Sequence, residues 1–158
     1  MQLNARPATL GEVAFALNQC IEISTDAEKG YAVAAADVRD PALKALLFQK
    51  SQERAGFVVA LQSALRTLGA YAENQGTAKG AAHRGWMDLR LAVEGQKDRI
   101  VIEEWVRGEQ AAVNGYRRAL ARTPMQTLPD AIRVLVAGQY SAMVSDLDLA
   151  RRRLAFLH

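Results

Sequence analysis

The chain has 158 residues, half of them hydrophobic, and carries a formal net charge of +3 at pH 7. This length and composition fit one globular domain over residues 1–158 with a sizeable core. The small positive excess argues against a nucleic-acid-binding protein, and the single cysteine, Cys20, excludes an intramolecular disulfide framework. No apolar run is long enough to span a bilayer, and the N-terminus lacks the order of a signal peptide. We therefore expect a cytoplasmic protein with no membrane partner.

Few prolines and abundant alanine, leucine, arginine and glutamate predict an all-α protein. The first helix is predicted over residues 9–39, because Thr9 begins a sequence with the spacing of a capping box. It ends before Pro41, which disfavours helical geometry in the preceding residue. Asp40 is a good N-cap for the second helix, predicted over 41–69, and so short a link makes the pair an antiparallel hairpin.

Residues 70–96 are predicted to form a crossover that contains a short helix. Two further long helices are predicted over 97–122 and 129–157, separated by a short proline-containing turn. One long crossover between two tight hairpins is typical of ferritin-like bundles. The sequence therefore predicts an all-α fold, a ferritin-like four-helix bundle of two antiparallel helix hairpins. Within the crossover, Trp86 and Met87 are expected to hold the short helix against the bundle.

Polar residues interrupt the apolar stripes near the middle of the long helices. Glu28 lies on the stripe of the first helix and Glu109 on that of the third, where an unpaired carboxylate would be costly. Arg54 falls near the middle of the second helix, so its guanidinium is expected to bridge the two carboxylates. Hydroxyl and amide groups complete a predicted polar core layer, whose members are Glu28, Arg54, Glu109, Gln139, Tyr31 and Tyr116.

A metal centre is the alternative for the same positions. A di-iron bundle needs a glutamate from each of two helices and a Glu-x-x-His pair from each of the other two. Glu28 and Glu109 meet the first requirement, but the second and fourth helices contain no inward histidine. The two histidines are His83, in the crossover, and the terminal His158. The alternative therefore places iron, manganese or zinc on Glu28 and Glu109, with Glu53 or Glu104 recruited as a further ligand, whereas the polar layer needs no cofactor.

Four segments carry a resemblance to a known family: E-K-G-Y at 28–31, D-P-A-L-K at 40–44, S-Q-E-R-A-G-F at 51–57 and H-R-G-W-M-D-L at 83–89. In these segments the chain resembles an uncharacterised bacterial family of ferritin-like four-helix-bundle proteins, classed as a domain of unknown function. The resemblance implies a ferritin-like bundle in a bacterial cytoplasm with no established reaction. The parent superfamily stores iron or activates oxygen at di-iron centres, and this sequence departs from that ligand pattern on its second and fourth helices.

The sequence favours a non-enzymatic protein with a structural, stress-related or interaction role, in which a buried Glu/Arg/Gln layer takes the place of a di-iron site. A divalent-metal or redox protein is the alternative, and enzymatic activity is left open. A homodimer is one arrangement that we consider. The role of His83 is also open, between a metal ligand and a surface or capping residue. The least favoured interpretation is an acidic or nucleic-acid partner bound by arginines of the last two helices, Arg117, Arg118, Arg122, Arg151, Arg152 and Arg153.

Overall fold

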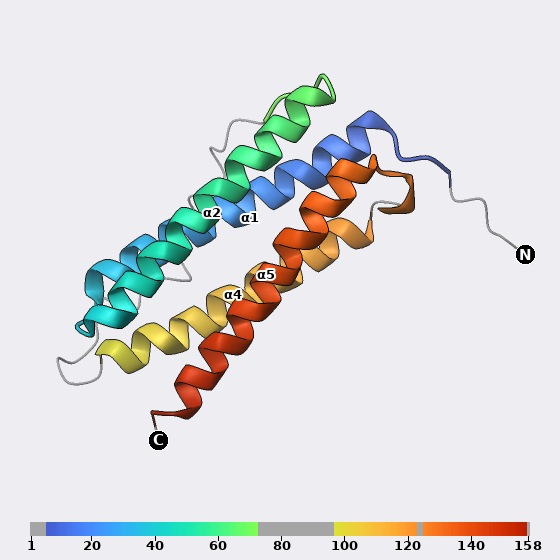
Figure 1. Ribbon diagram of the computed structural model, residues 1–158. Coiled ribbons are helices and arrows are strands. Elements are labelled where there is room, and N and C mark those ends of the chain that lie inside the picture. The colour runs from blue at the N-terminus through green and yellow to red at the C-terminus, as the bar shows by residue number, and fades with distance from the viewer. Residues whose placement is uncertain (1–5, 73–96, 123–124, 158) are drawn as a thin grey trace, which may run out of the picture.

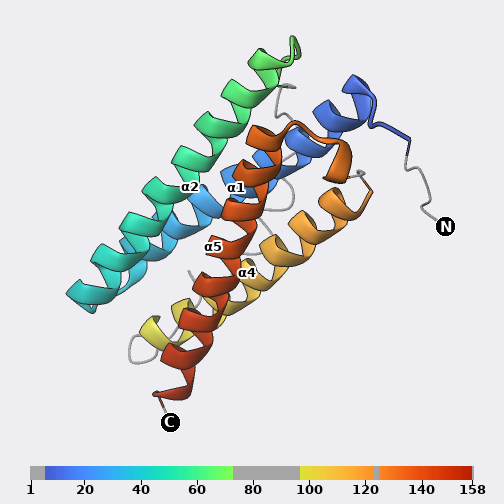
Figure 2. The same ribbon diagram turned by 45° about the vertical axis from the view of Figure 1, so that its right-hand side comes forward.

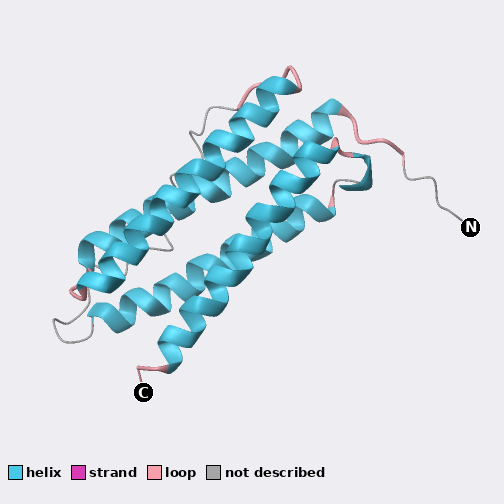
Figure 3. Ribbon diagram, in the orientation of Figure 1, coloured by secondary structure: helices cyan, strands magenta, loops and turns pink. Residues whose placement is uncertain are grey.

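The structure is a computed structural model that describes residues 6–72, 97–122 and 125–157. These residues form four long α-helices and one 3-10 turn, and contain no strand (Figures 1 and 3). The predicted all-α four-helix fold is confirmed. The expected short crossover helix, its anchors Trp86 and Met87, and His83 lie outside the described residues. The elements are α1 (Leu10–Asp37), α2 (Pro41–Thr67), α4 (Lys97–Ala121), η2 (Met125–Thr127) and α5 (Asp130–Ala155).

The ends of the helices are set by residues that the sequence marks clearly. Thr9 and Glu12 form a capping box, in which the Thr9 side chain accepts from the Glu12 N–H and the Glu12 carboxylate accepts from the Thr9 N–H. Asp40 caps α2 by accepting from the Leu43 N–H at 2.7 Å. Gly69, with a φ of 76°, ends α2, because the left-handed conformation it adopts favours glycine.

The helices pair as two antiparallel hairpins, α1 with α2 and α4 with α5, and α1 also packs against α4 (Figures 1 and 2). The start of α4 is held at the α1–α2 turn, where Asp98 accepts from the backbone N–H groups of Arg39 and Asp40 at 2.8 and 3.1 Å. Consequently α4 begins at the opposite end of the bundle from the end of α2, and these two helices run in the same direction. This is the ferritin-like arrangement. None of the described helices is long and apolar enough to cross a membrane.

In the part of the chain that the structure describes, the core forms two apolar clusters, one toward each end of the bundle. One cluster is built around Leu17, Leu61 and Tyr116, and the other around Leu47 and Trp105. Buried polar residues occupy the middle of the bundle between them. Cys20 belongs to the first cluster, and burial raises the pKa of its thiol to about 12, so it acts as a small core residue.

Candidate functional site

Arg54 lies at the centre of the bundle with its side chain fully removed from solvent (0% exposed). It is placed there by α2, whose inward positions Leu47 and Leu61 flank it by two turns on either side. A guanidinium cannot lose its proton at ordinary pH, so it must find opposite charge inside the core.

Two carboxylates from the other hairpin meet this guanidinium. Its Nη2 donates to Glu109 Oε1 on α4 and to Asp146 Oδ2 on α5, each at 2.7 Å. Lys50, one turn before Arg54 on α2, places its Nζ 2.8 Å from Asp146 Oδ1 and 2.9 Å from Glu53 Oε2. Two cations and three carboxylates thus form one connected layer that ties α2 to α4 and α5; we call these five residues the ion-pair layer.

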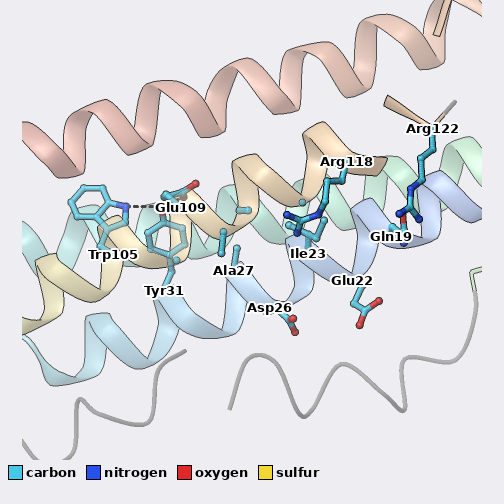
Figure 4. A pocket seen from close by; sticks show the side chains of 14 residues that line it. Gln19, Glu22, Ile23, Asp26, Ala27, Tyr31, Trp105, Glu109, Arg118 and Arg122 are labelled. Atoms are coloured by element: carbon cyan, nitrogen blue, oxygen red, sulfur yellow. Dashed lines mark hydrogen bonds between the residues drawn. The ribbon is translucent and has the colours of Figure 1, made fainter. Parts of the chain in front are cut away.

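Aromatic side chains close the layer on the side of α1. The Tyr31 hydroxyl donates to Glu109 Oε1, and Trp105 Nε1 donates to the Tyr31 oxygen at 2.7 Å (Figure 4). The Arg54 guanidinium lies 5.6 Å from the centroid of the Tyr31 ring and 4.9 Å from that of Phe57. Cation–π contacts of this kind stabilise a charge that has lost its water. All four long helices therefore contribute to the surroundings of Arg54.

A second polar chain lies about two turns along α4 from Glu109. The Tyr116 hydroxyl donates to Gln139 Oε1 at 2.8 Å, and the Ser24 hydroxyl lies 2.9 Å from the Tyr116 oxygen. Because Tyr116 has given its only proton to Gln139, Ser24 is the donor in that contact. Gln139 completes the chain by donating from Nε2 to the Phe57 carbonyl oxygen at 3.3 Å. These neutral groups are satisfied by one another and need no charge.

Burial and charge act in opposite directions on the groups of the ion-pair layer. Burial raises the pKa of the Glu109 carboxyl, while the Arg54 guanidinium opposes the rise. Burial acts most strongly on the pKa of Arg54 and lowers it, but the charges and hydrogen bonds of Glu109, Tyr31 and Asp146 together outweigh burial and raise the pKa, so the guanidinium stays charged. Burial, aided by Glu109, raises the pKa of Tyr31, which keeps the phenol protonated and able to donate.

The structure brings together five of the six residues of the predicted polar layer and corrects the sixth. Arg54, Glu109 and Tyr31 meet directly, and Tyr116 and Gln139 form the neighbouring chain. The expected bridge from Arg54 to Glu28 is wrong. Glu28 is half-buried and is joined to α2 through its backbone oxygen, which accepts from Ser51 Oγ at 2.9 Å.

The second carboxylate bound to Arg54 is Asp146 and not Glu28. It is 4% exposed and binds both cations of the layer, Arg54 and Lys50. Neither Asp146 nor Lys50 was singled out as a site residue from the sequence. The signal that could have found Asp146 is its place seven residues after Gln139, which returns to the same helix face after two turns.

The ion-pair layer does not fit a di-iron centre. Among the described residues, no three histidine, cysteine, aspartate or glutamate side chains are grouped so that they could hold a metal ion. Glu53, a proposed ligand, is paired with Lys50, and Glu109 is paired with Arg54. Because a guanidinium lies between Glu109 and Asp146, a cation placed there would meet a like charge at contact distance. Glu104, the other buried glutamate of α4, is paired with Arg107.

Comparison with known proteins places the chain in a family. Residues 12–122, which cover most of α1 and all of α2 and α4, match the family described as Domain of unknown function (DUF2383). The chain belongs to this family. Arg54 and Glu109 of this DUF2383 protein lie inside the matched region, whereas α5, with Asp146 and Gln139, lies outside it. No curated protein matches the chain.

Proposed function

We propose that this DUF2383 protein is a non-enzymatic ferritin-like bundle with a structural, stress-related or interaction role, in which the ion-pair layer takes the place of a di-iron site. The observation that carries the proposal is the fully buried guanidinium of Arg54, held 2.7 Å from both Glu109 and Asp146. These carboxylates would be needed as ligands in a metal centre, and here their charge is already balanced.

Electrostatics supports this interpretation. A divalent cation about 4 Å from a guanidinium would be repelled by on the order of 8 kcal/mol at the effective dielectric constant of about 20 that suits protein sites. Metal binding would therefore require Arg54 to leave the core, where it is surrounded by Tyr31 and Phe57. Ferritin-like chemistry also uses imidazole ligands, whereas α2 contributes Lys50 and Arg54 to the ion-pair layer and contains no histidine.

Metal analysis tests the proposal. The full chain is purified without chelator or affinity tag, incubated with one equivalent of Fe²⁺, Mn²⁺ or Zn²⁺, desalted and analysed by mass spectrometry of the elements. We expect far less than one metal ion per chain for each metal. Stoichiometric metal that is lost in Glu28→Ala and Glu109→Ala, but kept in the exposed control Glu103→Ala, would overturn the proposal in favour of a metal or redox protein.

A further inference from the structure

The outward face of α2 carries two large apolar side chains in contact with solvent. Phe48 is 58% exposed and Val59 is 61% exposed, and α2 lies at the edge of the bundle in Figures 1 and 2. Ala45, Gln52 and Gly56 are exposed on the same helix. Because steps of three or four residues separate these five positions, they lie on one face of the helix. We call Ala45, Phe48, Gln52, Gly56 and Val59 the α2 stripe.

The α2 stripe contains no charged residue. Every charged residue of α2 over residues 45–65 belongs to the ion-pair layer, namely Lys50, Glu53 and Arg54. The outward face of α4, in contrast, exposes four arginines, Arg99, Arg107, Arg117 and Arg118. Single exposed apolar residues are ordinary, but a surface that combines apolar side chains with a lack of charge is typical of the centre of a protein interface. The α2 stripe therefore has the composition of a contact surface.

The α2 stripe has the same spacing when it is counted from either end. Its steps are three, four, four and three residues, with Gln52 at the centre. When two copies of α2 lie antiparallel about a two-fold axis at Gln52, each residue faces the residue that is equally far from the axis in the other copy. Phe48 then faces Gly56 of the second copy, and Ala45 faces Val59. Each large side chain thus meets a small residue, as closely packed helices require.

The surface above Gly56 has room for a phenyl ring. A Cβ atom added at Gly56 would meet nothing within 4 Å. The absence of a side chain also lets a second helix approach closely at this point, within the interaxial distance of about 8 to 10 Å of packed helices. Phe48 of a second copy would lose contact with water there, which is the main favourable term in protein association.

The residue at the centre of the α2 stripe is suited to meet its own copy. A glutamine amide has both N–H donors and an oxygen acceptor, so two Gln52 side chains related by a two-fold axis can donate to each other. A charged residue at the same position would face an identical charge. The basic face of α4 would likewise bring arginine against arginine, which disfavours association through that face. Among these two faces, only the α2 stripe can meet itself without opposing like charges.

We propose that two copies of this chain associate through the α2 stripe, with their α2 helices antiparallel about a two-fold axis at Gln52. The contact covers residues 45–59, which is about 22 Å of helix at about 1.5 Å per residue. One helix pair of this length is small beside the roughly 800 Å² per partner of a standard interface, so we expect a dimer that dissociates in the micromolar range. The association goes beyond the proposed function and does not depend on whether the ion-pair layer excludes metals.

Sedimentation equilibrium of the full chain, over a series of protein concentrations from micromolar to millimolar, tests the association. We expect a monomer–dimer equilibrium. Phe48→Ser should weaken it at least about tenfold, because each dimer loses two buried phenyl rings. Phe15→Ser is the matched control, because Phe15 is 55% exposed on α1 and lies outside the α2 stripe, and it should dimerise as the parent does. A parent that stays monomeric throughout the series, or equal weakening by the two substitutions, would overturn the proposal.

A blocked surface provides a second readout. Gly56→Leu fills the space that the proposal gives to Phe48, so this variant should stay monomeric. Its melting temperature at low concentration should not fall, because leucine favours a helix more than glycine does. Gly138→Leu on α5 is the control, since a Cβ atom there also meets nothing within 4 Å, and it should dimerise as the parent does. A Gly56→Leu variant that dimerises as strongly as the parent would place the interface elsewhere.

Disulfide formation tests the position of the axis. Two copies of Gln52→Cys would meet at the axis and should link on mild oxidation, as measured on a non-reducing gel. Ser63→Cys is the control on the same helix, because it lies 11 residues from the axis. Its two copies would be about 33 Å apart at about 1.5 Å per residue, far beyond the Cα separation of about 4.4 to 6.8 Å in a disulfide. Failure of Gln52→Cys to link, or equal yields from the two variants, would overturn the proposed axis.

Discussion

An arginine–glutamate ion pair contributes differently to the stability of this protein when it is exposed and when it is buried. Arg99 and Glu103 form an exposed pair at 3.0 Å on α4, and Arg54 and Glu109 form a fully buried one at 2.7 Å. An exposed pair contributes about 0.2 to 1 kcal/mol because water solvates both partners when they separate. In the buried pair, removal of one partner leaves the other charge without water and without an opposite charge.

Arg54→Ala should therefore lower the free energy of unfolding by roughly 3 to 5 kcal/mol, because it leaves Glu109 without an opposite charge in the core and Asp146 with Lys50 alone. Arg99→Ala is the control and should change it by less than about 1 kcal/mol. Urea denaturation followed by circular dichroism measures both. A midpoint for Arg54→Ala equal to that of the parent would mean that the guanidinium is not needed to balance the layer.

Asp26 on α1 provides a test of pH dependence. Burial, with a contribution from the Glu22 charge, raises the pKa of the Asp26 carboxyl from 3.8 to about 6. Because the pKa is raised in the folded state, the protonated Asp26 carboxyl favours folding. Its contribution to the free energy of unfolding is fully present below about pH 4 and is lost as the pH rises through 6. Asp26→Asn should therefore raise the melting temperature at pH 7.5 but not at pH 4.

The neighbouring carboxylate serves as the control for this pH dependence. Glu22→Gln removes one cause of the raised pKa, so the pH at which the melting temperature of the protein falls should shift downward. A gain from Asp26→Asn that is equal at pH 4 and pH 7.5 would show that the carboxyl is not ionised differently in the folded state.

At the scale of the helix, the inward positions follow alternate steps of four and three residues. Helices that cross at a small angle present this 3.5-residue repeat to each other, whereas a stripe drawn at 3.6 residues per turn drifts away from it. In α1 the strict repeat passes through Ser24, Ala27 and Tyr31, and therefore misses Glu28. In α5 it selects Ile132, Val136, Gln139, Met143, Asp146 and Ala150, all of which are buried.

The strict repeat explains which part of the site was predictable from sequence. Arg54 and Glu109 lie on both the 3.6-residue stripe and the 3.5-residue repeat, so either method finds them. The two spacings disagree at Glu28, which only the 3.6-residue stripe selects, and at Asp146, which only the 3.5-residue repeat selects. The packed helices follow the 3.5-residue repeat at both positions. Hydrogen bonds between helices, such as that from Trp105 to Tyr31, depend on side-chain geometry that periodicity does not contain.

Substitution of one glycine on α4 and one on α5 tests how closely each helix packs against its neighbours. A Cβ atom added at Gly115 on α4 would lie 2.7 Å from Ile23 Cδ1 on α1, whereas one added at Gly138 on α5 would meet nothing within 4 Å. Ile23 Cδ1 is the end of a flexible side chain that must shift, so in Gly115→Ala this shift should offset most of the gain of about 1 kcal/mol from helix propensity and leave the stability nearly unchanged. Gly138→Ala should stabilise by up to about 1 kcal/mol through its higher helix propensity. Thermal unfolding of both variants measures the difference, and a stabilising Gly115→Ala would show that Ile23 moves aside freely.

At the scale of the whole molecule, the ion-pair layer separates two apolar clusters. The four-helix architecture was predictable because caps and prolines mark each turn, and the apolar stripes run the length of the helices. Apolar side chains alone do not fix which residue of one helix faces which residue of the next, because Leu and Val pack in several registers. A layer in which Arg54 must meet both Glu109 and Asp146 permits one register.

A variant with an uncharged layer should therefore keep its free energy of unfolding but adopt more than one register between its helices. The variant Arg54→Met/Glu109→Gln/Asp146→Leu removes the buried charges and retains an acceptor for the Tyr31 hydroxyl. Buried ion pairs replaced by well-packed neutral residues are often neutral or stabilising by about 1 to 4 kcal/mol, so the urea midpoint should not fall. We expect one set of amide resonances from the parent and several sets from the variant, and we expect light scattering to detect more than one oligomeric state of the variant. A variant that stays as uniform as the parent would show that the apolar clusters set the register by themselves, and the layer would then need another reason to be charged.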